Sequence, residues 1–180
     1  MISLNKIEFV QNEEIKNLTT YKTKGCILGA FYPKTEREFI YIYSFLKSGN
    51  QPFIVVGNGS NFLISDTAKI FVVSTKKLNN YIIIKNSKLY VSSSTMLSAV
   101  YSKTMNRNLS GFEALATIPA TIGGAIKNNA SAFNQTIFDN LEYIKVFDGK
   151  KSRKIYKDKI EYAYHKTNIT NCIILSAKFN

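Results

Sequence analysis

The feature that most constrains this chain is a glycine-rich break between two apolar runs in residues 51–66, QPFIVVGNGSNFLISD. The β-branched run at residues 53–56 predicts a strand, and the apolar residues 62–64 predict that the strand resumes after the bend. Small residues at positions 57–61 leave several backbone N–H groups unpaired and directed at one point, which is a way to hold a phosphate group. The sequence therefore predicts a pyrophosphate-binding loop.

The same residues allow a second interpretation. Asn58-Gly59 between two apolar runs is also a strong hairpin signal, because both residue types tolerate the positive φ of a type I′ turn. Taken alone, this stretch leaves both possibilities open.

Composition narrows the class of protein. A chain of 180 residues that is 45% hydrophobic can bury a core in one domain, with or without a small appendage. The formal net charge of +12 indicates an anionic partner, such as nucleic acid, a membrane surface or phosphorylated small molecules, although the lysines are scattered over the sequence. Its apolar runs are far shorter than the roughly 18 residues of a membrane span. With only Cys26 and Cys172, one disulfide is formally possible, but without a leader-like segment we expect a soluble cytoplasmic protein with two buried thiols. No metal site is expected.

The first third of the sequence predicts a strand–helix–strand unit. Residues 27–32 are typical of a strand, and residues 35–48 have one apolar helical face, with Thr35 as N-cap, Glu38 completing a capping box and Gly49 ending the helix. With the strand at residues 53–56, a parallel pair with a crossover helix is expected. The glycine-rich bend then follows the carboxyl end of a strand, where open α/β sheets bind ligands.

The remaining periodic segments predict one more helix and several strands. A helix is expected at residues 95–106, ending near Asn108. Tight turns are expected at Asn86-Ser87 and at Asp148-Gly149. The strands are expected at residues 70–74, 81–85, 88–93, 141–147, 151–156 and 173–179.

A second stretch of small residues, LSGFEALATIPATIGGAIKNNASAFN at 109–134, also suggests a ligand site. Pro119 and the Gly123-Gly124 pair make regular structure improbable before about Ala125. Small side chains let a flat ligand lie on the backbone, and a Gly-Gly turn that enters a short helix offers N–H groups to a phosphate. A tightly packed connecting loop is the alternative.

Three stretches in this order resemble one flavoenzyme family, the UDP-N-acetylenolpyruvoylglucosamine reductases. They are GNGSNFLISD at 57–66, SGFEALATIPATIGGAIKNNASAF at 110–133, and YAYHKT at 162–167 before the strand IILSAKF. The family carries G-x-G-S-N-x-L-x-x-D, G-x-E-x-x-x-x-I-P-G-T-x-G-G-A-x-x-x-N-A-G-A-[YF]-G and [FY]-x-Y-R-x-S. The stretch TTYKTKG at 19–25 is similar to its T-T-[FY]-x-x-G-G signature. The resemblance covers about residues 18–180.

The resemblance implies an α+β fold, the FAD-binding unit of the vanillyl-alcohol-oxidase/PCMH type, with two small α+β subdomains around the flavin at residues 1–75 and 76–180. It implies that FAD is the cofactor and NADPH the reductant of UDP-N-acetylglucosamine enolpyruvate in peptidoglycan synthesis. Tyr164 and His165 would lie on the side of the UDP-sugar substrate. The implied cofactor-binding residues are Gly57, Asn58, Gly59, Ser60, Asn61, Pro119, Thr121, Ile122, Gly123, Gly124 and Asn129.

The sequence also departs from the family. His165 stands where relatives carry arginine, and it lacks the permanent charge and rigid fork of arginine. The family's third domain has a proton-donating serine in G-S-x-F-[KR]-N-P and a late glutamate, and neither motif is in this sequence. Each glycine replacement adds a Cβ that narrows a wall facing the cofactor. The family glycines are replaced by Lys24, Ser92, Ser94, Ala120 and Ser131.

Two alternatives to an active reductase follow from these departures. The chain is expected either to be a shortened one, with a C-terminal domain or protein partner supplying the missing residues, or to be an FAD-binding or nucleotide-binding remnant without turnover. A basic nucleic-acid-binding protein is a further possibility because tyrosines are interleaved with lysines, although no block of basic residues is present.

Overall fold

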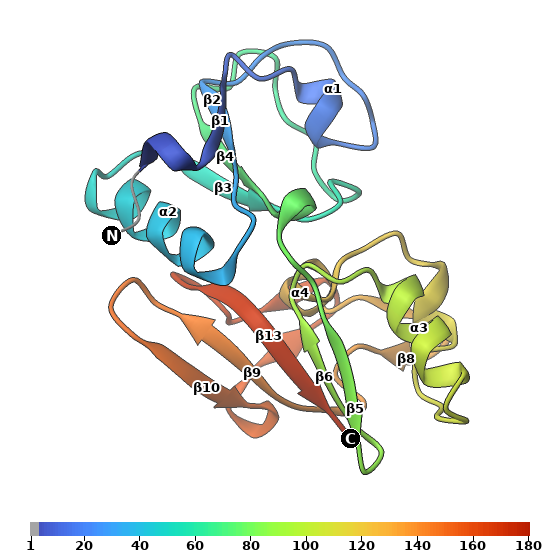
Figure 1. Ribbon diagram of the computed structural model, residues 1–180. Coiled ribbons are helices and arrows are strands. Elements are labelled where there is room, and N and C mark those ends of the chain that lie inside the picture. The colour runs from blue at the N-terminus through green and yellow to red at the C-terminus, as the bar shows by residue number, and fades with distance from the viewer. Residues whose placement is uncertain (1–3) are drawn as a thin grey trace. The chain divides into compact units, whose positions relative to one another are not determined.

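The computed structural model describes residues 4–180, so positions 1–3 of the expected first subdomain lie outside the described part. The chain divides into two compact units, Met1–Asn79 and Asn80–Asn180 (Figure 1). Each unit combines strands with helices, and the fold is the mixed FAD-binding type that the sequence predicts.

The first unit is built on a four-stranded sheet with strand order β1-β2-β4-β3. β1 pairs antiparallel with β2, while β4 pairs parallel with both β2 and β3. The expected parallel relation of the strands flanking α2 is therefore found, but β4 lies between them. In chain order the elements are η1 (Leu4–Lys6), β1 (Glu8–Gln11), α1 (Ile15–Leu18), β2 (Gly29–Tyr32), α2 (Glu36–Ser48), β3 (Phe53–Val56), β4 (Phe71–Ser74) and η2 (Thr75–Lys77).

The helix α2 begins at the expected cap. Thr35 Oγ1 accepts a hydrogen bond from Glu38 N at 3.2 Å. The Glu38 carboxylate accepts from Lys34 N at 2.6 Å, one residue earlier than a capping box requires. The helix ends at Gly49 with φ −78°, and Asn50 takes the left-handed conformation with φ 49°.

A buried carboxylate fixes the short helix α1 to the sheet of the first unit. Glu13 is only 5% exposed and accepts hydrogen bonds from Tyr32 Oη and Asn17 Nδ2, both at 2.8 Å. Burial, and then this hydrogen bond to Glu13, raise the pKa of Tyr32. The network therefore holds α1 and the residues that follow it against β2.

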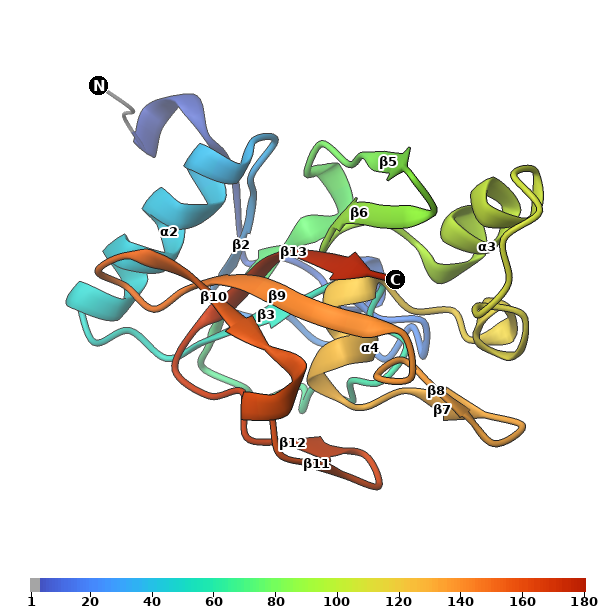
Figure 2. The same cartoon turned by 90° about the horizontal axis from the view of Figure 1, so that it is seen from below.

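The second unit is an antiparallel sheet covered on one face by helices. Strand order is β10-β9-β13-β6-β5, and these strands run side by side in Figure 1. α4 packs against β6 and β13 (Figure 2). The elements are β5 (Ile82–Lys85), β6 (Lys88–Ser92), α3 (Leu97–Met105), η3 (Ala114–Thr117), α4 (Ile122–Lys127), β7 (Ser131–Ala132), β8 (Gln135–Thr136), β9 (Leu141–Phe147), β10 (Ser152–Tyr156), η4 (Lys157–Lys159), β11 (Tyr162–Ala163), β12 (Lys166–Thr167) and β13 (Ile173–Phe179).

Two tight turns of the second unit are explained by the residues that form them. Asn86 and Ser87 have φ 48° and 61°, which is the pattern of a type I′ hairpin between β5 and β6. Asp148 Oδ1 accepts from Lys150 N and Lys151 N at 2.9 and 3.0 Å, which closes the turn between β9 and β10. The helix α3 ends at Asn106, two residues before the expected cap.

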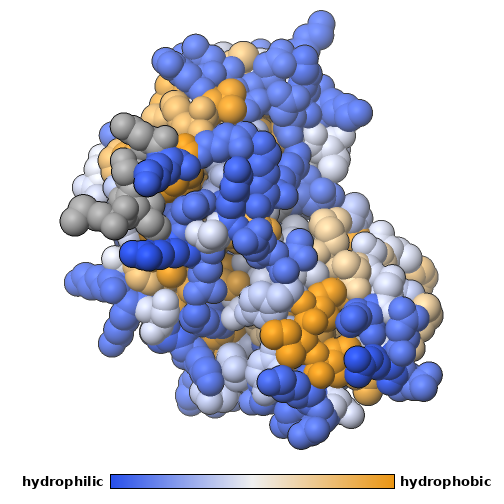
Figure 3. All heavy atoms as spheres, in the orientation of Figure 1, coloured by the Kyte–Doolittle hydropathy of each residue, from blue (hydrophilic) through white to orange (hydrophobic). Residues whose placement is uncertain are grey.

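The surface is mainly hydrophilic on the face shown in Figure 3, with an apolar patch over β5, whose Ile83 is 44% exposed. Across residues 4–180, no helix has both the length and the apolar character to cross a membrane. Both cysteines are thiols. The expectation that both are buried is wrong, because Cys26 is exposed and Cys172 half-buried.

Candidate cofactor site

In the first unit, the two sequence motifs at residues 19–25 and 57–66 lie against each other. Thr20 donates to Gly59 O through its backbone N at 3.1 Å and through its hydroxyl at 3.5 Å. A Cβ built on Gly25, which has φ +106°, would lie 2.7 Å from Asp66 Cα. The two glycines therefore allow the motifs to pack at backbone distance.

Gly59 is required by this packing. Its φ is +77°, and an added Cβ would lie 2.0 Å from the carbonyl oxygen of Leu18, the last residue of α1. Contact with a backbone atom cannot be relieved by rotating a side chain. The glycine signature of this loop is thus explained by the chain's own packing, whatever the loop binds.

The loop itself differs from both sequence interpretations. It is not a hairpin turn, because β3 is followed by the parallel strand β4 and only Gly59 of the Asn58-Gly59 pair has positive φ. The predicted resumption of the strand at residues 62–64 is also wrong, since these residues form no strand. Gly57, Asn58 and Ser60 are half-buried and Asn61 is exposed, just beyond the carboxyl end of β3. The bend therefore lies where the sequence placed it.

In the second unit, the predicted flavin segment runs alongside the chain that follows β6. Backbone hydrogen bonds join Leu97 N to Ala120 O, Ile122 N to Thr95 O and Gly123 N to Ser93 O, at 3.0, 2.8 and 2.8 Å. A Cβ on Gly123 would come within 2.9 Å of Ser93 Cβ. This close approach explains the first glycine of the pair.

The expectation that the Gly-Gly turn offers N–H groups to a phosphate is wrong. α4 begins at Ile122 rather than near Ala125, and its first N–H groups already have partners in the protein. Besides the bonds to Thr95 and Ser93, Gly124 N donates to Thr121 Oγ1 at 3.3 Å. Neighbouring chain supplies these partners, so a phosphate would have to displace existing bonds.

The other predicted residues of this segment differ in how far they are buried. Pro119 is exposed, Thr121 caps α4, and the side chain of Ile122 is fully buried in the hydrophobic core. Asn129 follows α4, is 6% exposed and has φ 43°. Ile122 is thus a core residue by position, whereas Asn129 is a buried polar residue that needs partners.

Asn129 also holds the hairpin that carries the predicted substrate-side residues. Its Nδ2 donates to Ala163 O at 2.9 Å, and Thr167 Oγ1 donates to Lys127 O at 2.9 Å. Tyr164 and His165 form the tip between β11 and β12, with their ring centroids 4.1 Å apart. Tyr164 is 81% exposed. The hairpin is therefore anchored at its base by hydrogen bonds, and its tip is exposed.

Three buried polar atoms without a protein partner lie in or beside the motif segments. Among residues 4–180, four such side-chain atoms occur, and one of them, Glu142 Oε2, lies 2.5 Å from Lys178 Nζ and so has its charge paired. The other three are Thr23 Oγ1 in the first motif, Ser93 Oγ beside Gly123, and Asn129 Oδ1. Since buried polar groups in proteins are normally hydrogen-bonded, these atoms fit a polar ligand such as FAD. Sequence reasoning missed Thr23 and Ser93, for which the flanking motif residues were the only signal.

The glycine replacements do not strain the fold. None of the five positions has positive φ in the described chain, so the added Cβ atoms meet no conformational penalty. Ser92 and Ser94 are buried, and the Ser92 hydroxyl lies 2.7 Å from Thr95 Oγ1 and 3.3 Å from Ser94 Oγ. These hydroxyls therefore belong to a bonded cluster next to the unpaired Ser93.

One further carboxylate in the second motif is fixed by backbone donors. Glu113 Oε2 accepts from Gly111 N at 2.8 Å. Hydrogen bonds from its own backbone N–H and from that of Gly111 hold the pKa of Glu113 below its ordinary value. Gly111 has φ +115°, and a Cβ there would meet Asn140 Nδ2 at 2.3 Å. Within the part of the chain that the structure describes, no three His, Cys, Asp or Glu side chains are placed to hold a metal ion.

The two-unit mixed fold and the unpaired polar atoms fit a domain of the flavin dinucleotide-binding class. Comparison with known families agrees: residues 27–152 match the model of the FAD binding domain. The chain belongs to this FAD binding domain family.

The similar proteins show which members of that family the chain resembles. The chain is 34% identical over 173 residues to the UDP-N-acetylenolpyruvoylglucosamine reductase of Fusobacterium nucleatum, covering 93% of this chain and 60% of the relative. It is 31% identical to the UDP-N-acetylenolpyruvoylglucosamine reductase of Clostridium novyi, and the match covers 98% of this chain and 58% of that relative. It thus corresponds to the FAD-binding part of these reductases and spans about 60% of their length.

Solved structures give the same relation. The UDP-N-acetylenolpyruvylglucosamine reductase from Thermus caldophilus superposes with a TM-score of 0.78 at 25% identity, covering 97% of this chain and 62% of that one. A cholesterol oxidase from Brevibacterium sterolicum reaches a TM-score of 0.69 at 11% identity, which shows the shared fold alone.

Proposed function

We propose that this chain binds FAD and acts as the flavin-binding part of a UDP-N-acetylenolpyruvoylglucosamine reductase. The observation that carries the proposal is the location of three buried polar atoms without partners, Thr23 Oγ1, Ser93 Oγ and Asn129 Oδ1. Thr23 and Asn129 lie in family motifs, and Ser93 lies beside Gly123 of the second motif, whose N–H donates to Ser93 O. The relation to reductases over most of the chain supports the substrate, UDP-N-acetylglucosamine enolpyruvate, and NADPH as reductant.

Different residues of the chain would bind different parts of the cofactor. The loop formed by Gly57, Asn58, Gly59, Ser60 and Asn61 would hold the pyrophosphate, since its small side chains let a ligand approach the backbone. Asn129, with Pro119, Thr121 and the Gly123-Gly124 pair nearby in sequence, would line the flavin together with Ser93, which accepts a hydrogen bond from Gly123 N. When bound, FAD supplies the hydride transfer that no side chain can perform.

The hairpin β11–β12 would position the substrate side of the site. Its base is fixed to α4 through Asn129 and Thr167, and its tip presents Tyr164 and His165. Anchoring at the base restricts the tip, which favours productive orientation of a bound substrate. Tyr164 would contact the substrate, and His165 would offer a ring nitrogen where relatives have arginine.

Removing the unpaired hydroxyls tests the flavin site without relying on turnover. We expect Ser93→Ala and Thr23→Val each to weaken FAD binding by about tenfold, because each variant loses one hydrogen bond to the ligand. Neither should destabilise the protein without FAD, since neither hydroxyl has a protein partner. Ser102→Ala is the matched control, because that exposed hydroxyl bonds to Ser98 O at 3.0 Å. FAD affinity measured by flavin fluorescence that is equal in all three variants would contradict the site.

A second candidate function is FAD binding without turnover. His165 in the position of the family's arginine favours it, because histidine cannot provide a permanent bidentate charge. NADPH oxidation that depends on the enolpyruvyl substrate distinguishes the two functions. The reductase proposal predicts such oxidation, while FAD binding without it, in the wild type and in His165→Arg, supports the second candidate.

A further inference from the structure

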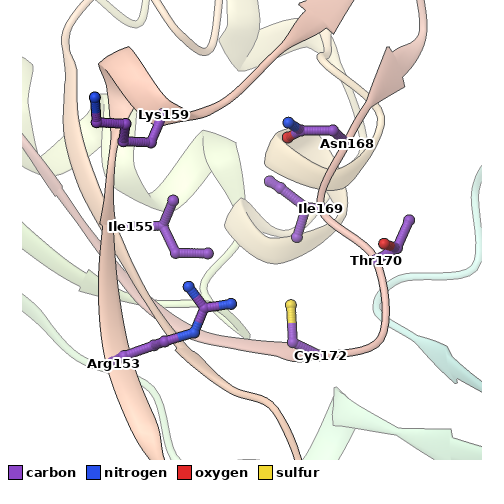
Figure 4. Close-up of a pocket in the computed structure, with 7 residues that line it drawn as sticks. All are labelled: Arg153, Ile155, Lys159, Asn168, Ile169, Thr170 and Cys172. Carbon is purple, nitrogen blue, oxygen red and sulfur yellow. The ribbon is translucent and has the colours of Figure 1, made fainter.

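The second unit contains a cavity of about 220 Å³ that the proposed function does not use. It opens between β10, η4 and the segment that joins β12 to β13 (Figure 4). None of its lining residues belongs to the predicted cofactor loops. They are Arg153, Ile155, Lys159, Asn168, Ile169, Thr170 and Cys172.

The lining combines cations and neutral donors with an apolar floor. In Figure 4 the guanidinium of Arg153 and the sulfur of Cys172 point toward the centre, Ile155 and Ile169 project from opposite walls, and Lys159 stands at the edge with its ammonium group directed away from the centre. Asn168 and Thr170 add an amide and a hydroxyl. The Arg153 guanidinium with these donors suits a phosphoryl group, and the isoleucines suit a short carbon chain.

The charge of Arg153 is only partly compensated by the protein. Its Nε lies 3.6 Å from Asp148 Oδ2, which is too long for a hydrogen bond. The Asp148 carboxylate is already stabilised by the backbone N–H groups of Lys151 and Lys150, which lower its pKa. Lys159 pairs with Asp158 at 3.4 Å, but both side chains are largely exposed, so this pair is weak. The Arg153 guanidinium is therefore the positive charge that an entering anion would meet, in competition with Asp148.

The walls of the cavity are fixed by bonds outside it. Lys127 Nζ donates to Ile169 O at 2.5 Å, and Asn168 N donates to Glu161 O at 3.0 Å. On the opposite wall, Arg153 and Ile155 lie on β10, which pairs with β9 along its whole length. A ligand would not have to order these segments, so little binding energy would be lost to entropy.

The volume selects the size of the ligand. At about 220 Å³ the cavity is smaller than the roughly 300–1,000 Å³ of ordinary cofactor and drug sites, yet it has the volume of about seven waters. A dinucleotide or a UDP-sugar is therefore too large to enter. We propose that this cavity binds a small organic phosphate, with its phosphoryl group on Arg153 and its carbon chain on Ile155 and Ile169.

Titration of the full chain with glycerol 3-phosphate tests this proposal by NMR. We expect saturable, millimolar binding that shifts the amide signals of residues 168–172, and no saturable shift with glycerol. Arg153→Gln should weaken binding at least about tenfold, because a charge-assisted contact is lost. Lys154→Gln is the matched control: it removes the same charge from the next residue of β10, which does not line the cavity.

Alkylation of the thiols gives a second readout. Glycerol 3-phosphate should slow the reaction of Cys172 with a maleimide but not that of the exposed Cys26 in the other unit. Equal loss of binding in Arg153→Gln and Lys154→Gln would reduce the effect to overall charge and overturn the proposal. Glycerate binding as tightly as glycerol 3-phosphate would overturn the assignment to phosphate. Displacement by FAD would show that the cavity is part of the cofactor site instead.

Discussion

Replacing Gly59 with alanine is expected to unfold or severely destabilise the first unit. Gly59 has φ +77°, and its Cβ would lie 2.0 Å from Leu18 O and 2.8 Å from Thr19 Cα. Both contacts are to backbone, so α1 or the loop itself must move. The glycine therefore couples two motifs that are forty residues apart.

The loss of unfolding free energy caused by Gly59→Ala is the sum of three contributions. A left-handed conformation costs a residue with a Cβ about 1–2 kcal/mol. Losing the hydrogen bond from Thr20 N to Gly59 O costs about 0.5–1.5 kcal/mol. The backbone shift that relieves the overlap adds about 1–3 kcal/mol, the usual range for overpacking. The expected loss is therefore about 3–6 kcal/mol, which is comparable with the whole stability of a small unit.

Hydrogen exchange measured by mass spectrometry separates the two units. Gly59→Ala should speed exchange in peptides from β2, β3 and β4, while β9 and β13 provide the internal reference. Gly49→Ala is the control, because φ is −78° there and the nearest contact of the added Cβ is an ordinary 3.4 Å. Protection in Gly59→Ala within about 0.5 kcal/mol of wild type, the size of an ordinary surface change, would refute the packing argument.

Three more variants test individual structural statements. Thr35→Ala removes the cap acceptor of Glu38 N and should cost about 1 kcal/mol, seen as faster exchange in α2 only. Phe133→Asn should stabilise the β7–β8 hairpin by about 1 kcal/mol in urea unfolding, because Phe133 has φ 48° and is 87% exposed; a loss instead would mean that the ring contributes to packing. The hydrogen bond from Lys178 lowers the pKa of Glu142, so its contribution to stability is present above the ordinary carboxyl pKa and is lost as pH falls through the lowered value. Glu142→Gln should therefore be less stable than wild type at neutral pH and equal to it in acid, whereas a pH-independent difference would contradict the ion pair.

The sequence predicted elements whose signal is local. β3, β9 and β13 have the expected bounds, since each is a continuous or alternating apolar run between turn residues. The cap of α2 and the Asn86-Ser87 turn follow from the chemistry of one or two residues. The order of strands in the first sheet was not predictable in the same way, because β4 enters between β2 and β3 through pairing that leaves no periodic signal.

The candidate site was predicted by its motifs but not by its geometry. Gly123 is a glycine because Ser93 approaches it, and Gly59 is a glycine because Leu18 does; neither neighbour is close in sequence. The helix α4 begins earlier than expected because residues 93–97 provide hydrogen-bond partners for its first turn. The unpaired polar atoms of Thr23 and Ser93 could be found only after the surrounding chain had been placed.

Binding of FAD is the central claim, and an equilibrium titration of the purified chain tests it most directly. Binding to the chain should quench or shift the fluorescence of the added FAD, and the change should saturate at one FAD per chain. Denaturing the complex should release intact FAD. A chain that purifies without flavin and also fails to take up added FAD, while its hydrogen exchange shows both units folded, would contradict the account.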